Sequence, residues 1–162
     1  AEIRGLSANL LRFSKNRAVI PYLEEKLDDR STFVRKSALI SLGRLDAVES
    51  VPAIIIVMNN DTDNFTRCQA AHALGVIQDE QAVVPLIHVL ERDQHALARQ
   101  TAANSLGEIG DDKAVEPLIH ALVDDAVLVQ SASRVALKRI TGGEVEPYVE
   151  IWNRCLNEKH LP

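Results

Sequence analysis

The sequence is poor in aromatic residues and cysteine, and it has no long apolar run. Aromatic side chains make up only 4% of the 162 residues, so a core must be built from aliphatic side chains. Cys68 and Cys155 lack CxxC spacing, which argues against a disulfide framework and for a reducing compartment. The longest apolar run, 51–58, contains a proline and is too short to span a bilayer. We expect a cytoplasmic protein without membrane association.

Sequence signatures of catalysis are also missing. There is no HExxH, no P-loop and no GxGxxG motif. Cys68 is expected to be a small buried thiol. The sequence therefore predicts no metal, no cofactor and no catalytic residue, and it gives little support for a small-molecule site. It begins at Ala1 without methionine, from which we expect a processed or excised piece.

What the sequence does contain is a repeat of about 32 residues. Successive prolines stand 31, 33, 32 and 30 residues apart, whereas the arginines and glycines keep a step of 32; the positions are Pro21, Pro52, Pro85, Pro117 and Pro147, Arg35, Arg67 and Arg99, and Gly43, Gly75 and Gly107. Self-similarity at this period is typical of stacked-repeat proteins. Such proteins are mostly surface, and they usually bind other molecules.

Between short polar breaks, apolar residues recur at intervals of three and four residues, which predicts helices joined by tight turns. Ten helices in five antiparallel pairs are expected at 3–13, 17–28, 32–43, 48–59, 64–76, 80–91, 95–108, 112–123, 126–140 and 144–157. The fold class is therefore all-α, a solenoid forming a single domain over 1–162. Its repeats are expected at 1–28, 29–60, 61–92, 93–123 and 124–162.

Each repeat carries residues with expected structural roles. The prolines fall in the first turns of the second helices, where a missing N–H costs little. The glycines either end a helix in the left-handed conformation or let backbones approach closely, and the sequence leaves both roles open. Phe33, Phe65, Leu97 and Leu128 stand two residues before the arginine line or its continuation and are expected in the core. Trp152 is expected to cap the core at the C-terminal end.

An aspartate precedes each arginine by six residues. The pairs are Asp29 with Arg35, Asp61 with Arg67, and Asp93 with Arg99. Because a guanidinium is planar and multidentate, each arginine can bridge the acid of its own repeat or of the next. We expect a structural ladder between repeats. In the last repeat Asp124 remains but Gln130 replaces the arginine, as expected for a terminal repeat.

Charge is distributed unevenly along the sequence. Residues 1–44 carry a net charge of +4, and residues 45–162 carry −9. This asymmetry predicts either an ordinary solvated surface or a docking preference that differs along the rod. Because nucleic-acid binding needs basic residues along a whole face, it is not favoured.

The phrases Ala-x-x-Leu-Gly and Ala-Val-x-Pro-Leu-Ile, clearest in 61–123, resemble the HEAT-like repeats first grouped with bilin lyases. The resemblance implies a right-handed α-solenoid whose second helices line a concave face. It leaves activity open, because the repeat is widely reused. A related iron enzyme uses His-Glu pairs, but none of the five histidines is followed by Glu. The di-iron interpretation therefore fails.

One line along the expected groove is the best candidate for contact with a partner. It comprises Glu24, Val51, Ile55, Val84, His88, Lys113, Glu116, His120 and Glu150. Two histidines on helices 8–10 Å apart seldom share a metal, so we expect half-exposed groove residues that contact a protein or peptide. The leading hypothesis is a non-catalytic protein-binding scaffold or adaptor. The alternatives are a subunit of a phycobilin lyase or isomerase, implied by the resemblance, and nucleic-acid binding through the basic N-terminal repeats.

Overall fold

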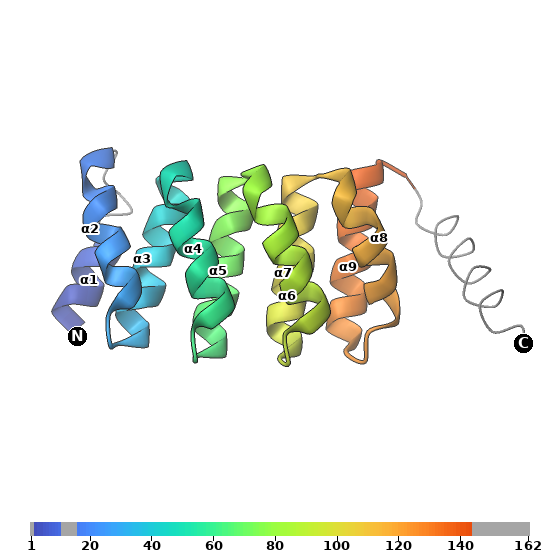
Figure 1. The fold of residues 1–162 in the computed structure, drawn as a ribbon, viewed down its shortest axis with the longest axis horizontal. Helices are drawn as coiled ribbons and strands as arrows, with labels where there is room; N and C mark the ends of the chain where they lie inside the picture. Colours follow the sequence, from blue (N-terminus) through green and yellow to red (C-terminus); the bar gives the residue numbers. More distant parts are fainter. Residues whose placement is uncertain (1, 11–15, 144–162) are drawn as a thin grey trace, which may run out of the picture.

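Helical hairpins stacked in chain order make up the part of the chain that the structure describes. The computed structural model describes residues 2–10 and 16–143, and within these ranges it contains no strand. Figure 1 shows the hairpins following one another along the long axis, from the N-terminal α1 to α9. This arrangement is the all-α solenoid predicted from the repeat.

The hairpins alternate between two kinds of helix. The first helices are α1 (Glu2–Leu10), α3 (Thr32–Arg44), α5 (Asn64–Ile77), α7 (Ala96–Ile109) and α9 (Val127–Thr141). The second helices are α2 (Ile20–Glu25), α4 (Val51–Asn60), α6 (Val83–Arg92) and α8 (Val115–His120). Short 3-10 turns precede the second helices as η2 (Arg17–Val19), η4 (Val48–Ser50), η5 (Glu80–Ala82) and η6 (Asp112–Ala114), and η3 (Lys26–Asp28) and η7 (Ala121–Val123) follow α2 and α8.

The predicted helix ranges agree with these elements to within a few residues wherever the chain is described. Residues 11–13 of the first range and the whole tenth range, 144–157, lie outside the described residues. The second helices differ in one respect, because each opens with a 3-10 turn. Asp79 and Asp111 accept hydrogen bonds from the backbone N–H groups of Gln81 and Lys113, which fixes those turns. Pro21 stands at the second position of α2, as predicted.

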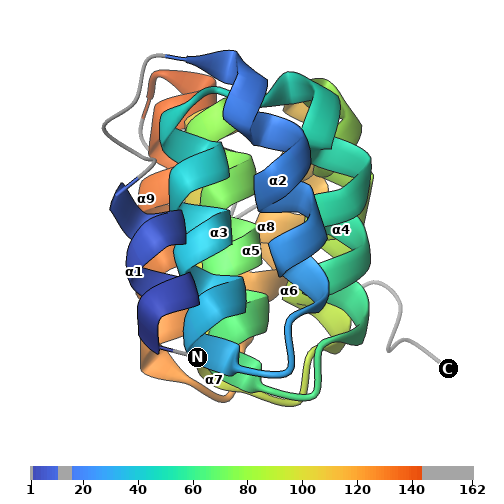
Figure 2. The same ribbon diagram turned by 90° about the vertical axis from the view of Figure 1, so that its left-hand side faces the viewer.

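The two kinds of helix form two layers. We call α1, α3, α5, α7 and α9 the first layer, and α2, α4, α6 and α8 with their 3-10 turns the second layer. Figure 2 shows the two layers side by side when the stack is viewed from its N-terminal end. Successive first-layer helices pack closely against one another, whereas successive second-layer helices barely touch. Leu42, Leu74 and Leu106 lie fully buried between the layers.

The repeated glycines permit this close packing. None of Gly43, Gly75 and Gly107 has a positive φ, so they do not terminate helices in the left-handed conformation. A Cβ built at Gly107 would lie 2.7 Å from the Ala136 Cα. The structure thus selects the second of the two roles left open, a close backbone approach between neighbouring first-layer helices. The left-handed helix ends are instead supplied by residues such as Gly110 and Gly142.

Arginine–aspartate pairs connect successive repeats along one edge of the stack. The guanidinium of Arg67 donates two hydrogen bonds to the carboxylate of Asp93 in the next repeat, at 2.8 and 2.9 Å. Its third nitrogen donates to the backbone carbonyl of Asp61 in its own repeat. Arg35 and Arg99 repeat this pattern. Each arginine therefore holds both its own repeat and the next.

The aspartates of the ladder also shape their own turns. The carboxylate of Asp93 accepts a hydrogen bond from the backbone N–H of His95, and that of Asp124 accepts one from Ala126. Burial acts to raise the pKa of Asp93, but its hydrogen bonds from Arg67 and His95 outweigh burial and hold the pKa below its ordinary range. The carboxylate of Asp93 thus orders its own turn and also accepts hydrogen bonds from the arginine of the preceding repeat.

The two ends of the ladder differ from its centre. At the N-terminal end, Arg4 of α1 donates to both carboxylate oxygens of Asp29 and lowers the pKa of that group to about 2. Arg4 was not recognised in the sequence, although it stands 31 residues before Arg35. In the last repeat the Gln130 amide donates to the backbone carbonyl of Asp124, which reproduces only the bond within the repeat.

Candidate functional site

The line of residues expected to contact a partner lies on the second layer, and its members differ in exposure. Val84 and His88 are exposed on α6. Ile55 on α4 is half-buried, and Glu24 accepts a 2.6 Å hydrogen bond from the Ser50 hydroxyl between two repeats. Glu24 therefore has a structural contact within the stack.

The remaining members of the line follow the same helical pattern. Lys113, Glu116 and His120 are exposed on η6 and α8. Val51 is fully buried at the start of α4, which corrects its placement among residues that can contact a partner. Glu150 and the expected cap Trp152 lie outside the described residues.

The concave side of the stack is formed by the first layer. A hollow of about 670 Å³ is lined by side chains from four successive first-layer helices, from Lys36 on α3 to Arg139 on α9. Helices that pack closely in one layer and separate in the other bend the stack toward the close-packed layer. The expectation that the second helices line the concave face is therefore corrected. The small residues that allow the close approach are visible in the sequence, but the direction of curvature depends on how the hairpins stack.

The surface of the first layer carries a row of exposed apolar side chains, which we call the apolar row. Its members are Phe33, Phe65, Leu97 and Leu128, with exposed fractions of 44%, 56%, 41% and 60%. They had been expected in the core. On α3 the buried positions include Val34, Ala38 and Leu42, and Phe33 is rotated by about 100° from Val34, which places it at the edge of the buried stripe.

The stripe that contains the apolar row continues along each helix at intervals of three and four. We call the whole surface the first-layer face. It comprises Phe33, Lys36, Ile40 and Arg44 on α3; Phe65, Gln69, His72 and Val76 on α5; Leu97, Thr101, Asn104 and Glu108 on α7; and Leu128, Val135 and Arg139 on α9. It is therefore a mixed apolar and polar surface that extends across four repeats.

Contacts between side chains order part of this face. The Lys36 ammonium lies 5.8 Å from the centroid of the Phe65 ring, within the range of a cation–π interaction. Cys68 lines the same hollow with 9% of its surface exposed, and burial raises the pKa of its thiol. A thiol held protonated is a poor nucleophile. The hollow thus presents binding groups rather than an activated cysteine.

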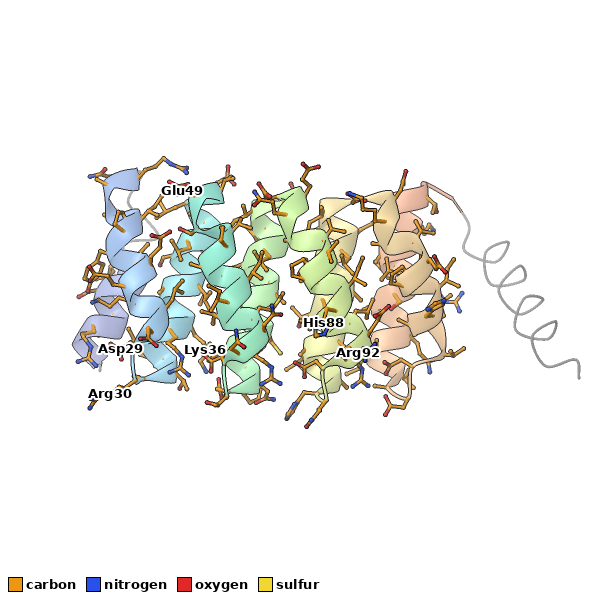
Figure 3. The ribbon with its side chains drawn as sticks, viewed as in Figure 1. Asp29, Arg30, Lys36, Glu49, His88 and Arg92 are labelled. Carbon is orange, nitrogen blue, oxygen red and sulfur yellow. The ribbon has the colours of Figure 1, made fainter. Side chains whose placement is uncertain are left out.

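The second layer has smaller crevices between neighbouring helices. One of about 410 Å³ is lined by His88 and Arg92 of α6 together with His95, Asp61 and Asp93. Figure 3 shows His88 and Arg92 on the same half of α6. Both aspartates accept hydrogen bonds from ladder arginines, and the Nδ1 atom of His95 lies 3.6 Å from the Oδ1 atom of Asp93. The acid nearest to a histidine in this crevice is therefore already engaged by Arg67.

The described residues offer no cluster of three or more His, Cys, Asp or Glu side chains that could hold a metal ion. In the described part of the chain, no helix is both long and apolar enough to cross a membrane. What the arrangement provides is a preformed surface with an apolar row, polar neighbours and a shallow hollow.

Comparison with solved structures identifies similar folds. The complex of CpcE and CpcF of phycocyanin lyase from Nostoc sp. PCC7120 gives a TM-score of 0.75 at 23% identity, covering 88% of this chain and 60% of that chain. Human deoxyhypusine hydroxylase in complex with glycerol gives a TM-score of 0.68 at 25% identity, covering 76% and 44%. The chain therefore spans less than two thirds of either structure.

Comparison with curated proteins gives no match. A family model for HEAT repeats matches residues 1–75 and 51–138, which together include most of the sequence. The match covers the stacked hairpins, the arginine–aspartate ladder and the apolar row. The chain belongs to the HEAT-repeat family.

Proposed function

We propose that this chain is a non-catalytic interaction module that binds another protein through the first-layer face. The observation that carries the proposal is the apolar row, four large side chains left exposed across four successive repeats beside a hollow. Contiguous exposed apolar surface of this kind often marks an interaction site. Because the ladder and the close helix packing fix the face before a partner arrives, binding carries a small ordering cost.

The spacing of the row indicates how a partner would lie. Packed helices are about 8–10 Å apart, so three steps from Phe33 to Leu128 span about 24–30 Å. A partner crossing the first-layer helices would contact each repeat in turn. This arrangement divides the binding surface over several equivalent positions rather than one deep pocket.

Photo-crosslinking tests which layer contacts the partner. We would place a photoreactive phenylalanine analogue at position 65 on the first layer or at position 84 on the second layer, because Phe65 and Val84 are similarly exposed at 56% and 66%. In native extract, we expect position 65 to cross-link to a discrete partner and position 84 not to. Cross-linking from position 84 alone would instead assign binding to the line containing His88.

A second measurement connects the cross-link to the apolar row. Replacing Phe65 and Leu97 with serine should abolish recovery of the same partner, whereas Val84→Ser with His88→Ser should leave it unchanged. Both pairs are exposed substitutions with little effect expected on the core. Equal recovery with all variants would refute the proposal.

A role as part of a phycobilin lyase or isomerase is a second candidate. It is supported by the likeness to the phycocyanin lyase complex, a structure whose chain is longer than this one. Mixing the protein with bilin and an apo-phycobiliprotein should then produce a new absorbance band, and a mixture without the protein is the control. If no band forms with the chain alone or with co-purified partners, this candidate is eliminated.

Nucleic-acid binding through the N-terminal repeats gains little support from the side-chain contacts. Arg4 is engaged by Asp29, Arg17 by Glu49 and two backbone carbonyls, and Arg35 by Asp61. Figure 3 places Glu49 at the edge of the stack opposite Asp29, so these contacts occupy both edges. Part of the basic charge of residues 1–44 is therefore already paired within the protein.

A further inference from the structure

The two layers carry opposite charge. Helices α3, α5, α7 and α9 contain eight Lys or Arg residues and a single acid, Glu108. The second-layer segments, with their 3-10 turns, contain four Lys or Arg and eight Asp or Glu. Three of the first-layer arginines belong to the ladder and are paired with aspartates. The basic residues of these helices outside the ladder are Lys36, Arg44, Arg134, Lys138 and Arg139, of which Lys36, Arg44 and Arg139 are considered as contacts for a partner.

These basic side chains come from opposite ends of the sequence. Lys36 and Arg44 belong to α3, whereas Arg139 belongs to α9 in the region whose net charge is negative. Lys36 and Arg139 line the same hollow as Phe65 and Leu97. Folding thus brings two basic side chains from distant parts of the sequence to the hollow beside the apolar row, although the whole chain carries −5.

We infer that the first-layer face binds an acidic polypeptide segment that carries large apolar side chains. This inference rests on the proposed function and names the chemistry of the partner. The carboxylates of the segment meet Lys36, Arg44 and Arg139, and its apolar side chains pack against the apolar row. Charge complementarity sets the orientation and speeds association, while the buried apolar contacts supply affinity.

The spacing between helices matches a particular backbone. A polyproline-II segment has three residues per turn and rises about 3.1 Å per residue, so side chains on one side recur about every 9 Å. That distance lies within the 8–10 Å separation of packed helices. A segment of about 12 residues with an apolar side chain at every third position would cover the row.

A polypeptide fits this face better than a nucleic acid. Bases stack on aromatic rings, and the apolar row offers such rings at Phe33 and Phe65 but aliphatic side chains at Leu97 and Leu128. A nucleic acid could therefore stack bases at two of the four repeats, whereas apolar side chains of a polypeptide can pack against the row in all four.

The probe is a fluorescein-labelled peptide of about 12 residues with the repeat Glu-Glu-Leu. Two control peptides have serine in place of leucine or lysine in place of glutamate. The third control probe is a single-stranded DNA of the same charge. Binding to the full chain is measured by fluorescence anisotropy. We expect only the Glu-Glu-Leu peptide to bind, and its affinity to fall as salt is raised.

Two charge-reversal variants locate the binding. Arg44→Glu with Arg139→Glu changes the first-layer face, and Arg92→Glu with Lys113→Glu makes the same change in net charge on the second layer. All four residues are exposed. We expect the first pair to weaken peptide binding by about tenfold, and the second pair by less than about twofold.

Each outcome decides the inference. Equal weakening by both pairs, binding of the serine or lysine peptide as tightly as the Glu-Glu-Leu peptide, or equally tight binding of the DNA would each overturn it. No binding of the Glu-Glu-Leu peptide would also overturn it. If position 65 still cross-links to a protein in any of these cases, the proposed interaction module stands and only the acidic chemistry of its partner is refuted.

Discussion

Alanine at two equivalent glycines should change stability in opposite directions. Gly43 and Gly107 occupy the same position in their repeats, each facing an alanine of the next first-layer helix. A Cβ at Gly43 would lie 3.4 Å from the Ala73 Cα, close to ordinary van der Waals contact. A Cβ at Gly107 would lie 2.7 Å from the Ala136 Cα. The two positions are equivalent in the sequence repeat, but the neighbouring helix lies closer to Gly107 than to Gly43.

The magnitudes follow from two opposing effects. Glycine inside a helix is about 1 kcal/mol less favourable than alanine, so Gly43→Ala should raise the free energy of unfolding by about 0.5–1 kcal/mol. At Gly107 the same gain opposes a clash with backbone, which cannot rotate away. Overpacking costs about 1–3 kcal/mol, and contact with a backbone atom favours the upper part of that range. Gly107→Ala should therefore lower the free energy of unfolding by about 1–2 kcal/mol.

Urea unfolding followed by far-UV circular dichroism measures both variants under the same conditions. Gly110→Ala is a matched control, because Gly110 has a φ of +79° with no atom within 4 Å of its added Cβ. It should lose about 1 kcal/mol from the left-handed backbone alone. If Gly107→Ala proved as stable as Gly43→Ala, close approach would not be the reason for glycine at this position.

Further predictions concern the ladder, its pH dependence and the buried hydroxyls. Arg67→Ala should lower the free energy of unfolding in urea by about 3 kcal/mol because both side chains of its ion pair are largely buried. Arg4→Ala should cost less than about 1 kcal/mol because the Arg4 side chain is half exposed; equal losses would contradict this burial argument. Because the folded-state pKa of Asp29 is lowered to about 2, its stabilising contribution should be complete above the ordinary carboxyl value of about 4 and be lost as pH falls through 2. Urea midpoints measured against pH test this, and Arg4→Ala should reduce the part of the pH dependence that comes from Asp29 without abolishing it, because the backbone N–H of Ser31 also lowers the pKa of Asp29. Ser105→Ala should cost about 1 kcal/mol because the Ser105 hydroxyl donates to the backbone carbonyl of Ala71, whereas Ser133→Ala should be neutral or stabilising, since within the described residues the Ser133 hydroxyl has no partner; calorimetric unfolding of both variants checks the difference.

Much of the fold could be predicted from periodicity because each repeat is a local unit. The spacing of apolar residues and polar breaks placed the helices 32–43 and 64–76, which the structure gives as α3 (Thr32–Arg44) and α5 (Asn64–Ile77). The six-residue interval between Asp61 and Arg67 correctly indicated that the two residues interact. It did not show that the side chain of Asp61 pairs with Arg35 of the preceding repeat, because that choice depends on how two hairpins stack.

The candidate site was harder to predict because it depends on which stripe of a helix faces outward. Phe33 and Phe65 are large apolar residues, for which burial was the natural expectation, but each stands one position before a buried residue and lies at the edge of the buried stripe of its helix. Val51 was expected at the surface as part of the groove line, but it falls within the buried stripe of α4. A single residue step along a helix rotates a side chain by about 100°, so small errors of register exchange core and surface.

The sequence by itself determined the all-α repeat, its pitch, most helix boundaries and the pairing of arginines with aspartates. These features follow from local periodicity and from residue chemistry at a fixed spacing. Only the tertiary structure decided which layer is concave, which apolar side chains are exposed and where charge gathers. Curvature depends on the difference in separation between helices in the two layers. The first-layer face joins α3 to α9, which lie far apart in the chain but line one hollow.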